Sequence, residues 1–138
     1  MTVSRITGLS LLLLLLVAPI GAHADDQKNL NLLSRKVLKP LVTMNLQRHW
    51  SPVQMHIGAP GMKSLDNNTT RVIYYTNIQL ADGTLMKMPE SYDVTRDASS
   101  TGKFASVYEI RPAGEKTSIM TVALRSDDQI VVLKGGRP

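Results

Sequence analysis

The first strong pattern of apolar and polar positions is an amphipathic segment from Gln27 to about Arg48. Its apolar residues recur at spacings of three and four, which places them along one side of a helix. They are Leu30, Leu33, Val37, Leu41 and Met44, and the opposite side carries Lys28, Asn31, Arg35 and Lys39. The pattern predicts an N-terminal helix, with Pro40 producing either a kink or the start of a second short helix.

After Trp50 the period changes to that of β-strands. The clearest strand runs from 71 to 80, where apolar and polar residues alternate. Asp82-Gly83 predicts a tight turn into a returning strand over 84–88, which Pro89 interrupts before 91–95. Three more strands are expected over 104–111, 117–124 and 129–133, and their short connections make them antiparallel. An edge strand is expected at 52–57 and a loop at 58–68.

One helix followed by four or five antiparallel strands predicts an α+β domain, in which the helix packs on one face of a meander sheet. This order resembles, in topology only, the cystatin-like and NTF2-like layouts, in which a curved sheet wraps a long N-terminal helix. The resemblance covers most of the chain after residue 24 and rests on no residue motif. A small closed β-barrel is the competing fold.

The first 24 residues have the pattern of an export signal. Arg5 precedes an apolar run from Leu9 through Val17, and Ala22-His23-Ala24 follows. Because the run is shorter than the roughly 18 to 20 residues that span a bilayer, we expect signal cleavage between Ala24 and Asp25 rather than a membrane anchor. Residues 25–138 are then expected to form a single domain.

The absence of cysteine bears on the compartment, since small secreted domains of eukaryotes are commonly held by disulfides. A bacterial periplasm, or the medium beyond it, is the expected location. Without residues 1–24, whose only charged side chain is Arg5, the net charge would be about +4, and it would speed encounters with anionic envelope molecules. We expect no nucleic-acid partner, because no basic run is interleaved with aromatic residues. No integral membrane span is expected either.

Methionine and histidine residues provide one candidate site, because thioether and imidazole groups bind soft ions such as Cu(I) or Ag(I). Met86 and Met88 would lie on one face of a strand. The whole candidate set is His49, Met55, His56, Met62, Met86 and Met88. Its ligand types are similar to those of periplasmic copper chaperones built on a small barrel, without a shared motif. Packing by flexible methionine side chains is the commoner explanation.

Signatures of catalysis are absent from the sequence. It has no Gly-x-Ser-x-Gly elbow, no His-Glu-x-x-His, no glycine-rich phosphate loop and no cysteine. His49 and His56 are available as bases, and Glu90 and Asp93 lie close together, but isolated carboxylates are far more often solvated than paired for catalysis. We therefore expect a protein that is not an enzyme and holds no cofactor, with a small periplasmic hydrolase as an alternative.

Aromatic residues provide the leading candidate for binding. Tyr74 and Tyr75 point to opposite faces of one predicted strand, so at least one should lie outside the core. Tyrosine and tryptophan are favoured at interfaces. The candidate binding residues are Tyr74, Tyr75, Tyr92, Tyr108 and Trp50. The leading hypothesis is an exported binding protein that contacts a protein or another envelope macromolecule through a sheet face or edge, and a homodimer would cover an apolar face.

Overall fold

The computed structural model describes residues 26–97 and 106–135. The chain divides into two units, residues 1–33 and 34–138. In the first unit, residues 26–33 are helical, and the side-chain amide of Gln27 donates to Asn31 one turn later, at 3.1 Å. The expected export signal at 1–24 lies outside the described residues. Within the described ranges, no helix combines the length and the apolar character needed to cross a bilayer.

The second unit begins with a π-helical turn, η1 (Ser34–Leu38), which leads into α2 (Lys39–Trp50). Pro40 lies in the first turn of α2, where its missing N–H costs no hydrogen bond. In a regular α-helix its ring would meet the carbonyl of Lys36, and the wider π turn removes that contact. Of the two alternatives predicted for Pro40, the structure is nearer the second, because proline lies in the first turn of α2, although α2 continues directly from the π turn instead of starting separately.

The π turn also changes which helical residues face the sheet. It inserts one residue into the helical repeat, so every later position is displaced by one. Leu38, Val42 and Leu46 are buried as a result. The positions that regular periodicity placed in the core are only partly covered, namely Val37, Leu41 and Met44. The predicted stripe is wrong by one residue in this part of the helix.

The seven strands within the described residues belong to one antiparallel sheet. They are β1 (Gln54–Ile57), β2 (Gly61–Ser64), β3 (Thr69–Gln79), β4 (Leu85–Arg96), β5 (Ser106–Pro112), β6 (Met120–Leu124) and β7 (Ile130–Gly135). β3 to β7 follow one another as neighbours, while β1 and β2 pair with opposite ends of β3 on its other side. The α+β class is confirmed. The expected count of four or five strands is too low, partly because residues 61–64 pair with β3 instead of lying in a loop.

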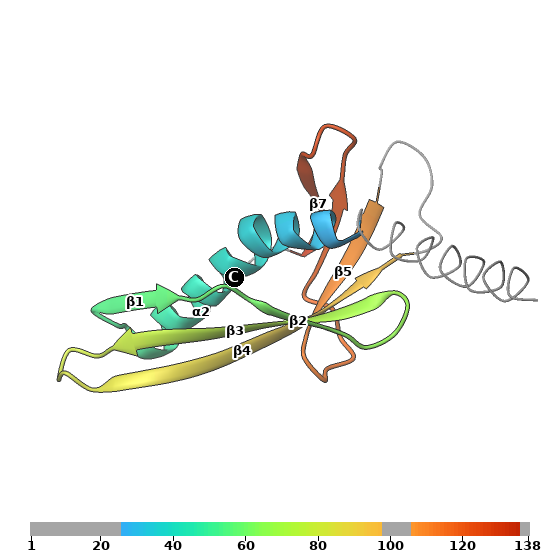
Figure 1. Cartoon of the computed structure of the whole chain (residues 1–138). Coiled ribbons are helices and arrows are strands. Elements are labelled where there is room, and N and C mark those ends of the chain that lie inside the picture. The colour runs from blue at the N-terminus through green and yellow to red at the C-terminus, as the bar shows by residue number, and fades with distance from the viewer. Residues whose placement is uncertain (1–25, 98–105, 136–138) are drawn as a thin grey trace, which may run out of the picture. The chain divides into compact units, whose positions relative to one another are not determined.

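The sheet is curled. β3 and β4 form a long hairpin, and only Tyr92–Arg96 of β4 pairs with β5. Figure 1 shows β5 to β7 turning away from that hairpin toward the side on which α2 lies. β7 does not pair with β1 or β2 among the described strands, so the curled sheet stops short of the closed barrel considered as the alternative.

Side chains along β3 and β4 alternate between the two faces of the sheet. One face is covered by α2, and we call the other the outer face. Val72 and Tyr74 are buried against the helix side, whereas Tyr75 points outward. The hydroxyl of Tyr74 bonds both the side chain and the carbonyl of Ser34, which connects β3 to η1. The sheet supplies most of the core of this unit: Val72, Tyr74, Ile78, Tyr92, Val94, Tyr108, Ile110, Met120, Val122, Ala123 and Leu124.

β4 continues through Pro89, where the sequence predicted an interruption. The Ser91 carbonyl accepts from the Ala113 amide, at 3.0 Å, on the β5 side of the strand. Backbone groups alternate in direction along a strand, so the Pro89 nitrogen points to that same side. No described strand lies beside this part of β4. The proline therefore loses no ladder hydrogen bond, as expected for a strand edge.

Candidate functional site

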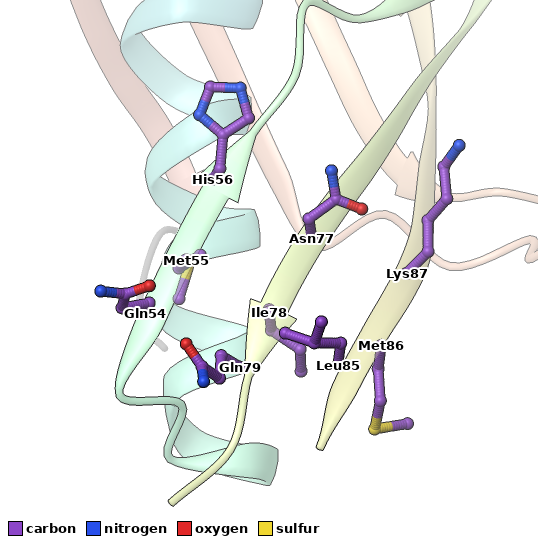
Figure 2. Close-up of a pocket in the computed structure, with 9 residues that line it drawn as sticks. All are labelled: Gln54, Met55, His56, Asn77, Ile78, Gln79, Leu85, Met86 and Lys87. Carbon is purple, nitrogen blue, oxygen red and sulfur yellow. The ribbon is translucent and has the colours of Figure 1, made fainter. Parts of the chain in front are cut away.

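The outer face of the sheet is hollowed where β1, β3 and β4 run side by side. We call this depression of about 750 Å³ the outer groove. Figure 2 shows the side chains that project from the three strands there. The strand register places them in two cross-strand rows, His56–Asn77–Lys87 and Gln54–Gln79–Leu85. Met55, Ile78 and Met86 lie between these rows and also line the depression, although the strand alternation directs their side chains toward α2.

The turn between β3 and β4 sets the register of these rows. Gly83 has a φ of 88°, which glycine adopts without strain. The Asp82 carboxylate accepts from the Thr84 amide at 2.9 Å, and these Thr84 hydrogen bonds lower the pKa of Asp82. The Asp-Gly hairpin predicted from the sequence is therefore confirmed, and it aligns Gln79 with Leu85.

The polar side chains of the outer groove are available to a partner. Within the described ranges, the side chains of Gln54, His56, Asn77 and Gln79 make no hydrogen bond to another residue. The Lys87 amine lies 5.2 Å from the centroid of the Tyr75 ring, a cation–π contact. The lining contains this lysine and no carboxylate. It therefore suits neutral polar or anionic groups.

Exposed apolar side chains accompany the carboxamides. Leu85 lies within the outer groove and is 76% exposed, and Tyr75 beside Lys87 is 52% exposed. Val53 belongs to the same end of the sheet because its amide bonds the Gln79 carbonyl at 2.8 Å, and it is 60% exposed. Apolar area combined with a few polar groups is the usual composition of a recognition surface.

The structure distributes the candidate aromatic residues between core and surface. Tyr74, Tyr92 and Tyr108 are buried. Tyr75 lies on the outer face, and Trp50 is exposed at the C-terminal end of α2, outside the lining of the outer groove. The folded surface therefore offers Tyr75 and Trp50, out of the five candidates, to a partner.

The candidate metal ligands are spread over both faces of the sheet. Met55 and Met86 flank Ile78 in one cross-strand row, and Met88 follows on the same face, toward α2. His56 points to the outer face instead. The remaining two candidates lie elsewhere, with Met62 beside Val72 and His49 on α2. Residues 26–97 and 106–135 contain no cluster of three or more His, Cys, Asp or Glu side chains able to hold a metal ion.

Glu90 and Asp93, neighbours in the sequence, belong to opposite faces of β4. Glu90 faces the helix and accepts from Asn45 at 3.3 Å and from the Tyr92 hydroxyl at 3.4 Å. Burial raises the pKa of Glu90, and burial together with the nearby Glu90 charge raises the pKa of Tyr92. The two carboxylates are therefore separated by the sheet and form no acid–base pair.

Asp93 on the outer face belongs to a polar cluster that lies apart from the outer groove, farther along the β3–β4 hairpin. Arg71 donates to its two carboxylate oxygens at 2.8 and 3.1 Å, and the Gly114 amide donates at 3.2 Å. The Arg71 hydrogen bonds lower the pKa of Asp93. Arg111 donates to the Thr95 hydroxyl at 2.9 Å. The cluster joins β3, β4 and the β5–β6 turn at the place where the sheet begins to curl, and sequence reasoning did not identify it.

Comparison of the chain with protein-family models, curated proteins and solved structures gives no match. The inference of function therefore rests on the residues of this chain.

Proposed function

We propose that this chain is an exported, non-enzymatic binding protein of a bacterial periplasm or the extracellular space, and that it contacts an envelope or secreted macromolecule through the outer groove. The observation that carries the proposal is a depression that combines exposed Leu85 with carboxamide side chains that make no hydrogen bond among the described residues, while exposed Tyr75 lies beside it against Lys87. Carboxamides both donate and accept hydrogen bonds, so they can bind polar groups of a partner, while the apolar side chains bury apolar surface against it.

Contact through the face is favoured over strand addition at the neighbouring edge. The open edge of β4 includes Lys87 and Pro89. Proline has no N–H to offer an added strand, and lysine on an edge strand discourages pairing. A partner at this end of the sheet therefore gains more from the side chains of the outer groove than from the backbone of β4.

The charge distribution supports a partner with anionic groups. The whole chain carries a net charge of +5, and the lining of the outer groove contains one of its lysines, Lys87, and no carboxylate. Complementary potentials speed encounter and orient the partner, although they contribute less to affinity than buried contacts do. The export signal expected at residues 1–24 would bring this basic surface to anionic envelope molecules.

The surroundings of the outer-groove histidine favour binding over catalysis. Nucleophilic catalysis needs a base that is oriented by a third group. No described side chain hydrogen-bonds His56. The raised-pKa carboxyl of Glu90, a potential acid, faces α2 on the opposite side of the sheet.

The proposal is tested by capture of crosslinked complexes from intact cells that express the tagged chain. Asn77→Arg fills the middle of the outer groove, and Asn67→Arg makes the same change at an exposed position in the β2–β3 connection. We expect one specific macromolecule with the wild type and with Asn67→Arg, and its loss with Asn77→Arg. Recovery of the same complex with Asn77→Arg, or a cytosolic protein that begins at Met1, would contradict the proposal.

A further inference from the structure

β7 is the last strand of the curled sheet, and its outer edge has no partner among the described strands. Its apolar residues are exposed on both sides of the strand, since Val132 is 49% and Leu133 46% exposed. An apolar edge of this kind is a template for pairing with another strand. β7 lacks the proline that protects the open edge of β4.

The backbone direction along β7 identifies the groups that a new strand would meet. The Gln129 carbonyl accepts from the Arg125 amide at 2.9 Å, so the backbone of Gln129 faces β6. The direction of the backbone N–H and C=O groups alternates along a strand. The backbone groups of Val131 therefore point toward β6, and those of Ile130 and Val132 point away from it. A β-bulge between β6 and β7 places an extra residue after Val132 and limits the regular edge to residues 130–132.

The charges at the two ends of β7 are opposite in sign. Asp127 and Asp128 precede the strand, and Lys134 lies at its end. A second copy of β7 placed antiparallel about Val131 would bring its acidic end against the basic end of the first. Lys134 then lies beside Asp128 of the second copy. The bulge shifts this pairing by at most one residue. A parallel arrangement would put like charges together, so the strand is complementary to itself only in the antiparallel sense.

We propose that this chain forms a twofold-symmetric homodimer in which the β7 strands of two copies pair antiparallel and join their sheets. Ile130 and Val132 exchange backbone hydrogen bonds with Val132 and Ile130 of the second copy. The contact is isologous, as a closed dimer requires. The proposal is independent of the outer groove, which lies on β1, β3 and β4.

The short regular edge makes this a weak dimer. Pairing through three regular residues and their flanking charges belongs to the small interface class, below about 1,200 Å². We therefore expect a dissociation constant on the order of 10–100 µM, and a mass distribution that changes with concentration.

Sedimentation of the chain, as purified from expressing cells, from 1 µM to 1 mM tests the proposal. Lys134→Glu, and the double variant Asp127→Lys with Asp128→Asn, each place like charges at both ends of the pair, and we expect each to weaken dimerisation at least tenfold. An equimolar mixture of the two variants restores opposite charges at both ends, so dimers should reappear in the mixture. All three residues are exposed, and unchanged circular dichroism verifies the fold.

A chain that remains monomeric at 1 mM would overturn the proposal. A dimer that is insensitive to both charge reversals, or a mixture that sediments like its separate components, would also overturn it. Val132→Pro gives a second check, because it removes an N–H that points away from β6 and keeps the backbone of Val131 facing β6. This variant should not form the dimer.

Discussion

Replacing Asp93 by asparagine removes the charge from a carboxylate that ties three segments together. Asp93 is only 5% exposed and accepts from Arg71 of β3 and from Gly114 in the β5–β6 turn. Asparagine keeps the size of the side chain and one carbonyl acceptor. We expect Asp93→Asn to fold with the same topology and to have a smaller free energy of unfolding than the wild type.

The expected loss follows from the geometry of the Asp93 contacts. A hydrogen bond to a charged group contributes about 1.5–3 kcal/mol. The Arg71 side chain is one-third exposed, so solvent screens part of its attraction, and the asparagine carbonyl retains one bond. The loss should therefore be about 2 kcal/mol at pH 7. For a domain of this size the unfolding midpoint falls by roughly 8 °C.

The pH dependence has a definite sign. Arg71 bonds the ionised form of Asp93, so its pKa in the folded protein lies below that in the unfolded chain. The stabilisation is fully present above the unfolded pKa, near about 3.9, and is lost as the pH falls through the folded pKa. The difference between wild type and Asp93→Asn should therefore shrink as the pH falls below 4.

Urea denaturation followed by circular dichroism at pH 7 and pH 3 measures both effects. Asp127→Asn is the matched control, because its carboxylate lies 3.8 Å from Arg125 and both side chains are half-exposed. That control should lose less than about 0.5 kcal/mol. A stabilising role for the Asp93 carboxylate is refuted if Asp93→Asn loses no more free energy of unfolding than Asp127→Asn at pH 7, or if its loss is the same at both pH values.

Three further changes test other parts of the fold. Tyr74→Phe leaves the buried Ser34 carbonyl without its hydroxyl donor and should lower the free energy of unfolding by about 1–2 kcal/mol in urea denaturation. Ser34→Ala retains that carbonyl and should cost less, so a smaller cost for Tyr74→Phe would argue against the contact. Burial raises the pKa of Glu90, so Glu90→Gln should be more stable than wild type at pH 7. This advantage should disappear below the pKa of the unfolded chain, about 4.3. An equal difference in thermal unfolding above and below that pH would contradict the prediction. Pro89→Thr adds an N–H to the open edge of β4 and should increase self-association in sedimentation with little change in stability; unchanged sedimentation would count against an open edge.

The β3–β4 hairpin could be predicted because its signals are local. Alternation from Val72 to Ile78 assigns every side chain to a face, and Asp82-Gly83 sets the register of the returning strand. Burial along β3 agrees with this assignment. The interruption predicted at Pro89 is wrong, because the sequence does not show which side of a strand remains unpaired.

The other features depend on contacts between distant segments. The π turn at Ser34–Leu38 shifts the buried stripe of the helix, and the Tyr74 hydroxyl that bonds Ser34 is 40 positions away along the chain. The pairing of Asp93 with Arg71 requires the register of β3 against β4. The outer groove likewise needs β1 beside β3, which brings His56 to Asn77. No spacing in the sequence encodes these pairings.

The most direct measurement of the central claim replaces Asn77 by a photoreactive amino acid and irradiates intact cells. A residue at this position projects from the middle strand of the outer groove (Figure 2). If the outer groove binds a partner, we expect a specific crosslinked species from position 77 and none from position 67 on the β2–β3 connection. Equal crosslinking at both positions, or crosslinking from position 67 alone, would contradict a binding role for the outer groove.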